Sequence, residues 1–322
     1  MPRKQNRSIA VVCGGPSAEA EVSRVTARGV AQALRDSYEN VTTVELDERI
    51  SESLKELKTE VVFPALHGPP GEDGTFQGFL EILGIPYVGS GVEASACAMD
   101  KVVAKQIFRA FGLPVARDLI VHRSARRAET ARHIAQALGS DVVVKPSCQG
   151  SAVGVSFARN DREIDEALER AFVYDERLLI EERISGREIT VAILERNGIE
   201  ALPVIEIRTP SGTWYDYEHR YTPGLSEHIV PAPLPAAQYA RTQEVAKLAF
   251  QCLNCRDLAR VDFVVPEEGE PIVLEVNTLP GMTPTSLYPD AARAGGLSFE
   301  ELVAYLVERA WARGQKRKAQ SR

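Results

Sequence analysis

Two apolar segments near the C-terminus constrain the fold most, because their pairing as a β-hairpin can be worked out from the sequence of residues 258–283. The segment EEGE at residues 267–270 is typical of a four-residue hairpin loop. With this loop, one face of the hairpin contains only apolar cross-strand pairs: Val261 with Val276, Phe263 with Leu274, and Val265 with Ile272. Side chains alternate across a strand, so the same register also predicts the opposite face.

That opposite face is polar. Asp262 lies across from Glu275, and Arg260 lies across from Asn277. Two carboxylates directly opposite each other destabilise a sheet, so such a pair favours a cation between them. Oxygen ligands from Asp, Glu and Asn suit Mg²⁺ or Mn²⁺. The register therefore predicts a metal site formed by Asp262, Glu275 and Asn277, and the alternative is a solvated polar face on an edge hairpin.

Length and charge limit the class of protein. A chain of 322 residues is long enough for two or three domains with buried cores. The net charge of −7 gives no overall attraction to nucleic acid, so local cations must hold any phosphate group. The apolar run Ile9–Cys13 is too short for a signal sequence or a membrane span, so we expect a cytoplasmic protein with no membrane contact.

The five cysteines are odd in number and dispersed, which favours reduced thiols over a disulfide framework. Cys252 and Cys255 form one CxxC motif in a helical-looking run. No second pair and no nearby histidine accompany it, so zinc binding or redox chemistry is disfavoured.

The order of elements predicts an α/β chain. Residues 8–100 alternate helical stretches with apolar strands, at Ile9–Cys13, Val61–Leu66 and Ile85–Val88, which is typical of a parallel α/β layer. An amphipathic helix begins at Lys101, with Val103, Ile107, Ala110 and Phe111 at helical spacing, and ends before Gly112 and Pro114. We therefore expect a domain boundary near residue 100.

The rest of the chain predicts two further units. Strands at Asp141–Val144 and Leu178–Glu182 enclose a turn, another strand and a charged helix at residues 160–172. A strand at Glu188–Leu194, the hairpin and a last helix at Phe299–Ala312 follow, and the polar tail 314–322 is expected to fray. The expected domains are residues 1–100, 101–185 and 186–322.

Two segments could bind a nucleotide. The turn VVVKPSCQGSAVGV contains small residues beside Lys145, so its backbone amides could approach a phosphate, although plain turn chemistry explains it as well. Lys101 and Lys105 lie one helical turn apart and offer further cations, unless they are simply solvated. Around the next turn, Glu181 and Glu188 could accept hydrogen bonds from adenine and ribose, or form ion pairs with neighbouring arginines.

Two loops that follow strands could bind a substrate. The first strand ends in CGGPSAEAEVS, where Ser17 could cap a helix and Glu19 lies in its first turn. This segment lacks the third glycine of a dinucleotide fingerprint, so hydride chemistry is disfavoured. The loop ALHGPPGEDG contains His67 at the carboxyl end of another strand. The long connection at residues 211–234 is typical of a lid, with Arg220 and Tyr221 expected to point inward.

Together these segments resemble the D-alanine:D-alanine ligases of the ATP-grasp superfamily. The resemblance extends from about Ser8 to Ala312 and rests on eight motifs in the order and spacing of the family. The motifs are GGPSAEAEVS, ALHGPPGEDGTFQG, GSGVEASACAMDK, VKPSCQGSAVGV, EERISGREITVAIL, TWYDYEHRY, ARVDF and LEVNTLPGMTPTSL. The implied fold is an N-terminal parallel α/β domain followed by a two-subdomain, α+β ATP-grasp fold. A homodimer is also implied.

The resemblance implies roles residue by residue. The residues that would bind ATP are Lys101, Lys145, Glu181, Ile184, Glu188 and, on the lid, Arg220. Those that would bind two Mg²⁺ or Mn²⁺ ions are Asp262, Glu275 and Asn277, the set that the hairpin register predicts independently. The implied catalytic residues are Glu19, Ser151, Tyr221, Arg260, Gly281 and Ser286, and the remaining second-substrate contacts are His67 and Leu287.

The implied reaction joins two D-alanine molecules at the expense of ATP, through an acyl phosphate, for peptidoglycan precursor synthesis. Arg220 stands where the family usually has lysine, and Ala152 replaces a serine that often follows Ser151. Tyr221, in place of the phenylalanine of depsipeptide-forming relatives, favours D-alanine over D-lactate as second substrate. The alternatives are a ligase for D-serine, D-lactate or another second substrate, and a non-catalytic nucleotide-binding regulator.

Overall fold

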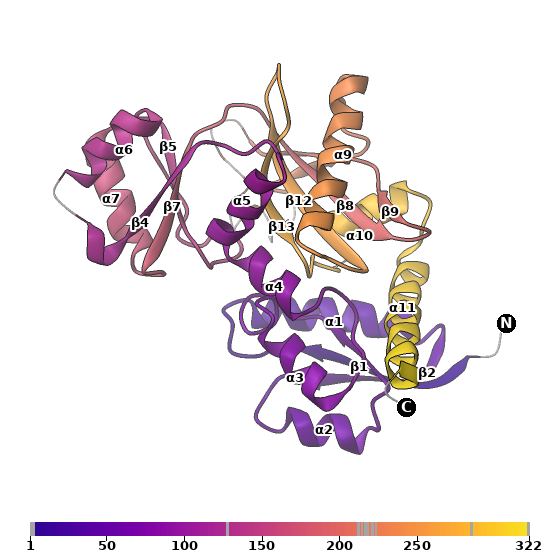
Figure 1. Cartoon of the computed structure of the whole chain (residues 1–322). Coiled ribbons are helices and arrows are strands. Elements are labelled where there is room, and N and C mark those ends of the chain that lie inside the picture. Colours follow the sequence, from indigo (N-terminus) through magenta and orange to yellow (C-terminus); the bar gives the residue numbers. More distant parts are fainter. Residues whose placement is uncertain are drawn as a thin grey trace.

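The computed structural model describes residues 4–126, 129–210, 213, 215, 219, 222, 224–283 and 286–320. Three sheets organise these residues, and Figure 1 shows them as three neighbouring groups of strands with their helices. The first sheet is parallel and the other two are antiparallel, so the predicted α/β fold with an α+β remainder is confirmed.

The N-terminal sheet has the strand order β2-β1-β3. Its strands are β1 (Gln5–Cys13), β2 (Tyr38–Glu45) and β3 (Val61–Pro64), and its helices are α1 (Ala20–Leu34), α2 (Ile50–Glu56) and α3 (Thr75–Leu83). The sequence did not indicate β2, because this edge strand buries only Tyr38 and Val44. The strand predicted at Ile85–Val88 is wrong: it forms one bridge between Val62 and Tyr87, and Pro86 has no N–H to extend the pairing.

The second sheet has the order β4-β7-β5-β6. Its strands are β4 (Asp118–His122), β5 (Val142–Pro146), β6 (Ser156–Ala158) and β7 (Arg177–Glu182), and its helices are α6 (Thr130–Leu138) and α7 (Asp161–Ala171). A short 3-10 turn, η1 (Arg123–Ala125), follows β4. Both helices pack on one face, where Val142, Val144, Leu178 and Ile180 enter the core. Because side chains alternate, Lys145 and Glu181 lie on the face away from these helices.

Two helices connect the first two sheets, α4 (Val92–Met99) and α5 (Lys101–Ala110). The helix predicted from Lys101 is confirmed, but the buried side was misjudged. Phe111 is 58% exposed, whereas Ala104, Lys105 and Phe108 are buried. Helix α5 packs on α4, on α9 (Ala236–Cys252) and on β13 (Ile272–Asn277) rather than on a single sheet, so its buried side is rotated from the apolar stripe.

The third sheet has the order β11-β10-β8-β12-β13, with β9 paired to β8. Its strands are β8 (Arg187–Glu195), β9 (Ile199–Ala201), β10 (Ile205–Arg208), β11 (Glu227–Ile229), β12 (Leu258–Val265) and β13 (Ile272–Asn277). Helix α9 (Ala236–Cys252) packs against the face that carries Val191, Val261 and Phe263. The other face carries Thr190, Arg260 and Asp262, and it borders the site described below.

The hairpin register is confirmed at the polar end and wrong at the tip. Arg260 pairs with Asn277, Val261 with Val276 and Asp262 with Glu275, as predicted. Beyond Asp262 the register shifts by one, so that Phe263 pairs with Val273 and not with Leu274. The irregularity leaves Leu274 as an extra residue on β13, which allows Val273 and Val276 both to face the core.

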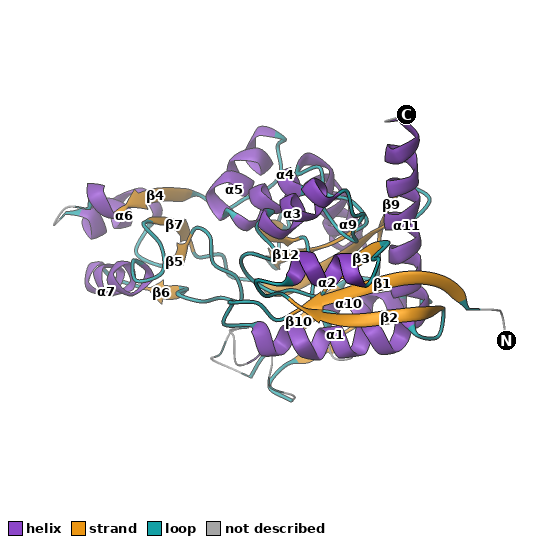
Figure 2. Ribbon diagram, turned by 90° about the horizontal axis from the view of Figure 1, so that it is seen from below, coloured by secondary structure: helices purple, strands orange, loops and turns teal. Residues whose placement is uncertain are grey.

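The C-terminal helix returns to the N-terminal sheet. After α10 (Leu287–Ala294), α11 (Phe299–Gln320) packs against α1 and β3, and Leu302, Val303 and Leu306 share one core with Val30 and Leu34. Figure 2 shows α11 rising beside the N-terminal strands. The predicted end at Ala312 and the frayed tail are wrong, because the helix continues to Gln320.

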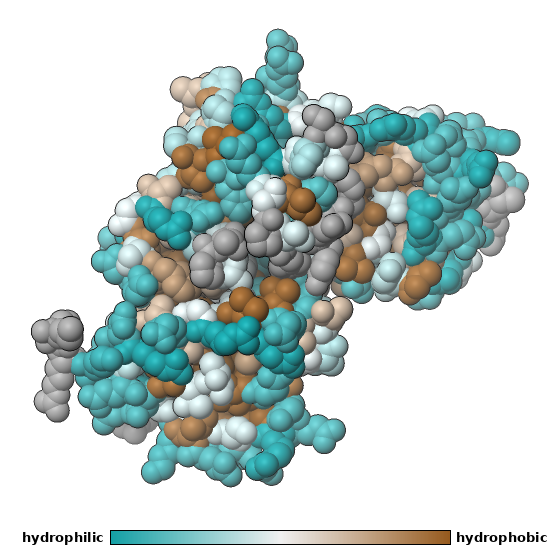
Figure 3. All heavy atoms as spheres, turned by 180° about the vertical axis from the view of Figure 1, so that it is seen from behind, coloured by the Kyte–Doolittle hydropathy of each residue, from teal (hydrophilic) through white to brown (hydrophobic). Residues whose placement is uncertain are grey.

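Within the part of the chain that the structure describes, no helix is both long enough and apolar enough to cross a bilayer. The face shown in Figure 3 is largely hydrophilic, with apolar side chains in small separate groups.

Candidate active site

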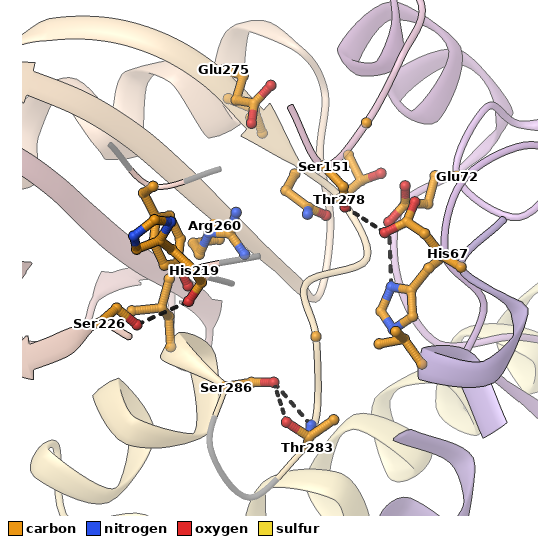
Figure 4. Close-up of a pocket in the computed structure, with 18 of the residues that line it drawn as sticks. His67, Glu72, Ser151, His219, Ser226, Arg260, Glu275, Thr278, Thr283 and Ser286 are labelled. Carbon is orange, nitrogen blue, oxygen red and sulfur yellow. Dashed lines mark hydrogen bonds and ion pairs between the residues drawn. The ribbon is translucent and has the colours of Figure 1, made fainter. Parts of the chain in front are cut away.

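A cavity of about 670 Å³ opens where the N-terminal loops, the glycine-containing turn of the second sheet and the hairpin of the third sheet meet. Figure 4 shows His67 and Glu72 on one side, Ser286 and Thr283 on another, and Arg260 and Glu275 on strands that border the space. The predicted site residues among its lining are Glu19, His67, Lys101, Ser151, Arg260, Glu275, Asn277, Gly281, Ser286 and Leu287.

Glu19 and Ser151 bring the first and second sheets together. Ser151 donates a hydrogen bond to the Glu19 carboxylate across a sequence separation of 132 residues. Glu19 immediately precedes α1 and is 8% exposed. Ser151 and Ala152 adopt φ values of +47° and +60°, a left-handed conformation that is costly for residues other than glycine. The turn is therefore held in a conformation that presents the Ser151 hydroxyl to Glu19.

His67 is fixed by two neighbours that the sequence did not indicate. Its Nε2 lies 3.1 Å from the Thr26 hydroxyl on α1, and its Nδ1 lies 3.8 Å from the Glu72 carboxylate. Glu72 also accepts a hydrogen bond from the Gly68 amide at 3.0 Å. The spacing of His67 and Glu72 within one loop is a weak signal, whereas the Thr26 contact depends on how α1 packs.

The polar face of the hairpin forms one wall. Arg260 donates to both oxygens of Asp262, at 2.8 and 2.7 Å, and the Thr190 hydroxyl donates to Asp262 at 2.6 Å. Lys101 lies 3.2 Å from Glu275. Burial acts against the charged form of Arg260, but the adjacent carboxylate of Asp262 outweighs it and raises the pKa of the guanidinium. Among the described residues, Asp262 thus faces the guanidinium of Arg260, and Glu275 faces the ammonium group of Lys101.

The donor set of the hairpin fits a hard divalent cation. Asp262 and Glu275 contribute carboxylate oxygens, and Asn277 contributes an amide oxygen whose orientation is set by the Leu279 amide at 3.0 Å. Among the described residues, no three His, Cys, Asp or Glu side chains meet in a metal-binding geometry. A metal ion here would therefore depend on two carboxylates, an amide and the phosphates of a nucleotide, as is common for Mg²⁺.

The segment after the hairpin leads into α10. Ser286 is the residue before the helix, and its hydroxyl oxygen accepts from the Thr283 amide at 3.1 Å. A Cβ on Gly281 would lie only 2.9 Å from this oxygen, so a larger residue at position 281 would force the Ser286 hydroxyl to move. Leu287, the first helical residue, is 4% exposed. The start of a helix favours negative charge, although Pro289 in the first turn of α10 has no N–H to donate.

Two of the residues predicted to bind the nucleotide, Lys145 and Glu181, lie on the face of the second sheet that is turned away from α6 and α7. Lys145 and Lys105 both contact the Glu181 carboxylate. Burial of Glu181 acts to raise its pKa, but the two lysines outweigh burial and hold that pKa below its ordinary value. Ile184 lies in the loop after β7, and Glu188 is the second residue of β8.

Lys101 lines the cavity and also contacts the turn that follows β5. Its ammonium group donates to the Gln149 carbonyl in that turn at 2.6 Å. Arg220 and Tyr221, which are predicted to belong to a lid, lie outside the described residues.

A histidine–aspartate pair in the cavity wall was missed by the sequence analysis. His228 Nδ1 of β11 lies 2.9 Å from Asp290 of α10, which Arg293 also contacts at 2.8 Å. Burial acts to raise the pKa of Asp290, but His228 and Arg293 together lower it. The two residues are separated by 62 positions, so no local motif could have indicated the pair.

The two thiols of the CxxC motif lie in an apolar environment. All five cysteines are free. Burial raises the pKa of Cys252 to about 11 and that of Cys255 to about 12. Both thiols pack against the apolar core beneath α9.

Comparison with known proteins decides the family. A family model described as the D-ala D-ala ligase C-terminus matches residues 107–308, and one described as the D-ala D-ala ligase N-terminus matches residues 43–90. The chain belongs to the D-alanine–D-alanine ligase family. The resemblance stated from its motifs is thereby confirmed.

Relatives and solved structures of this family match along nearly the whole chain. The D-alanine–D-alanine ligase of Halalkalibacterium halodurans is 45% identical over 301 residues, covering 93% of this chain and 97% of the relative. That of a Synechococcus species is 46% identical over 311 residues, covering 96% and 94%. The crystal structure of the Bacillus anthracis ligase has a TM-score of 0.85 at 34% identity, covering 97% of this chain and 99% of that one.

A second structure of the Bacillus anthracis ligase, complexed with ATP, has a TM-score of 0.83 and covers 98% of this chain.

Proposed function

We propose that this chain joins two molecules of D-alanine to form D-alanyl-D-alanine for peptidoglycan synthesis, with conversion of ATP to ADP and phosphate. The observation that carries the proposal is the meeting, in one cavity of a member of this ligase family, of the Glu19–Ser151 pair with the polar face of the hairpin. A carboxylate is a poor electrophile, so an amide can form from it only after activation.

The first step is phosphoryl transfer. The carboxylate of the first D-alanine attacks the γ-phosphate of ATP, which gives an acyl phosphate and ADP. Glu19 and Ser151 position this substrate, and Lys101 and Lys145 balance the phosphate charge. Positioning and charge neutralisation supply most of the acceleration in such a transfer.

Asp262, Glu275 and Asn277 would hold two Mg²⁺ or Mn²⁺ ions, which neutralise phosphate charge when bound. Within the protein, Arg260 and Lys101 lie against the two carboxylates of this set. Glu275 lies next to Lys101 and is paired with Asp262 on the neighbouring strand. Of the three proposed ligands, it is therefore the one best placed to contact both metal ions.

The second step forms the amide. The amine of the second D-alanine attacks the acyl phosphate carbonyl, and phosphate leaves. Arg260 and the Gly281 amide would stabilise the tetrahedral oxyanion, an effect worth about 3 to 4 kcal/mol for each donor. His67, Ser286 and Leu287 would bind the second substrate.

The lid must exclude water, because water would hydrolyse the acyl phosphate. Arg220 and Tyr221 are proposed to contact ATP and the Glu19–Ser151 pair, respectively, in the closed enzyme. Arg220 supplies a planar guanidinium where the family usually has an ammonium group, so its contact with ATP has a different geometry.

The main alternative is a ligase that uses D-serine or D-lactate as second substrate. Phosphate release measured against D-alanine, D-serine and D-lactate at neutral pH distinguishes them. We expect the highest kcat/KM with D-alanine, and a clear preference for D-lactate would contradict this choice.

We further propose the domain limits 1–100, 101–185 and 186–322, a cytoplasmic homodimer, and no nucleic-acid or membrane partner. The negative net charge supports the absence of a nucleic-acid partner. Sedimentation at several protein concentrations tests the dimer.

Glu275→Ala tests the reaction itself. The change removes a proposed metal ligand, so we expect kcat to fall by about a thousandfold or more in an ADP-release assay with D-alanine and Mg²⁺. Glu268→Ala, in the exposed loop of the same hairpin, is the matched control and should retain full activity. Undiminished turnover in Glu275→Ala would refute the proposed reaction centre.

A further inference from the structure

Two carboxylates face each other on the side of the second sheet that is turned away from α6 and α7. Asp118 of β4 is directly paired with Glu181 of β7. Little of either side chain is exposed, since Glu181 is 3% exposed and the Asp118 side chain is 8% exposed. Like charges directly opposite each other destabilise a sheet, and burial makes the cost larger. The arrangement therefore depends on cations supplied from elsewhere in the fold.

Lys105 of α5 supplies one of them. Its ammonium group contacts Glu181 Oε1 and lies 3.4 Å from Asp118 Oδ1, and the residue is only 5% exposed. Lys145 of β5 contacts the other oxygen, Oε2, of Glu181. Arg109, one turn further along α5, contacts Asp118 and not Glu181. Each oxygen of Glu181 is thus paired with a different lysine.

Nucleotide binding would change the contacts of Lys145 with Glu181 but not those of Lys105. Under the proposed function, on which this inference rests, Lys145 turns to the phosphates and Glu181 faces the adenine amino group. Glu181 then retains Lys105 alone. A buried carboxylate without a neighbouring cation takes up a proton, and a protonated carboxyl presents a donor where the ionised form only accepts.

We propose that Lys105 is a positioning residue that acts through Glu181. It keeps the Glu181 carboxylate ionised, and therefore a hydrogen-bond acceptor, in the nucleotide complex. In this way it sets the preference for a 6-amino purine over a 6-oxo purine. The 6-amino group of adenine donates to an ionised carboxylate. The 6-oxo group of hypoxanthine accepts, so it opposes an ionised carboxylate but pairs with a protonated one. Lys105 never needs to touch the nucleotide for this effect.

The test compares ATP with ITP in Lys105→Met. We expect the ratio of kcat/KM for ATP to that for ITP to fall by about tenfold or more, because a charge-assisted hydrogen bond is exchanged for a neutral one. The Michaelis constant for D-alanine should change by less than about twofold, since the substitution alters only the contact between Glu181 and the purine. Lys105→Arg, which retains the charge, should restore the preference.

Two further variants separate this role from a merely structural one. Arg109→Met removes a neighbouring cation of the same helix that contacts only Asp118, and it should leave the ATP-to-ITP ratio unchanged. In a Glu181→Gln background there is no carboxylate to keep ionised, so adding Lys105→Met should not change the ratio further. An equal loss with ATP and ITP in Lys105→Met, or the same shift in Arg109→Met, would overturn the inference.

Binding of ADP and IDP, measured by calorimetry without D-alanine, makes the outcome independent of turnover. Absence of ADP release by the unaltered protein with D-alanine would overturn the proposed function, while the ADP-to-IDP affinity ratio in Lys105→Met would still decide the role of Lys105. Thermal unfolding followed by circular dichroism shows whether Lys105→Met is folded. If it is not, Lys105→Gln, which retains a polar head group, carries the same expectation.

Discussion

At the scale of single residues, Ser151 has a clear physical signature. It is held at a left-handed φ of +47° while it donates to the carboxylate of Glu19. Ser151→Ala removes a hydrogen bond to a charged group, an interaction worth about 1.5 to 3 kcal/mol. We therefore expect the Michaelis constant for the first D-alanine to rise by about tenfold or more, with a smaller change in kcat. Steady-state kinetics with D-alanine varied at saturating ATP measure both.

The matched control for Ser151→Ala is Ser156→Ala. Ser156 begins β6, and its hydroxyl interacts only weakly with Arg170, at 3.4 Å. Its removal should leave the kinetics unchanged. If Ser151→Ala also left them unchanged, Ser151 would only shape the turn.

The thiols make a second prediction at this scale. Burial and the neighbouring Glu45 raise the pKa of Cys13 to about 11, and burial raises that of Cys252 to about 11 and that of Cys255 to about 12. The thiolate is the reactive form, so at pH 8 only about one thiol in a thousand is reactive at a pKa of 11. We expect slow reaction of the native protein with Ellman's reagent and release of five equivalents after denaturation. Rapid labelling of Cys252 or Cys255 in the native protein would contradict their burial.

At the scale of elements, α7 begins with a well-formed cap. The Asn160 side chain accepts from the Glu163 amide at 3.0 Å, and the Glu163 carboxylate accepts from the Arg159 amide at 2.8 Å. Asn160→Ala should destabilise the helix start by about 1 kcal/mol. Amide hydrogen exchange in the first turn of α7 should then be faster, whereas Asn160→Asp should retain the protection. Equal protection in all three proteins would mean that packing alone holds the helix end.

The hairpin shows how far sequence reasoning extends for an element. The polar end could be predicted, because opposing Asp262 to Glu275 and Val261 to Val276 leaves one consistent register. The shift beyond Asp262 could not, since Val273 and Leu274 are both apolar and either could face Phe263. The choice depends on how α9 packs beneath the sheet, which is tertiary information.

The candidate site likewise contains residues that could be predicted from the sequence and contacts that could not. Residues adjacent to glycine-containing turns and at strand ends, such as Glu19, His67 and Ser151, could be proposed from local motifs. The contacts that hold them could not: Thr26 reaches His67, and Lys105 reaches Glu181, only through the packing of α1 and α5. In particular, the spacing of Lys105 along a helix suggests a solvated side chain, whereas the fold buries it.

At the scale of the whole molecule, α11 ties the third sheet to the N-terminal one. Asp257, which has no exposed surface, precedes β12 and accepts from Arg313 through both carboxylate oxygens at 2.8 Å. The Gly89 amide donates to the same carboxylate at 3.0 Å, and Arg313 also donates to the Tyr87 carbonyl at 2.8 Å. One arginine in the last turns of α11 therefore joins the segment between α3 and α4 to the strand that carries Arg260 and Asp262.

This arrangement predicts a sharp dependence on chain length. A chain ending at Ala312 loses Arg313 and leaves the buried Asp257, among the residues that the structure describes, with Arg309 as its remaining cation at 3.2 Å. Removing one partner of a buried ion pair costs about 3 to 5 kcal/mol, so we expect the urea midpoint of unfolding to fall by about 1 M. A chain ending at Lys316 retains Arg313 and should keep nearly the full midpoint, although both shortened chains lack the Arg317–Glu81 pair. Equal midpoints for the two would show that the hydrophobic part of α11, around Leu302 and Leu306, is sufficient to hold the N-terminal sheet in place.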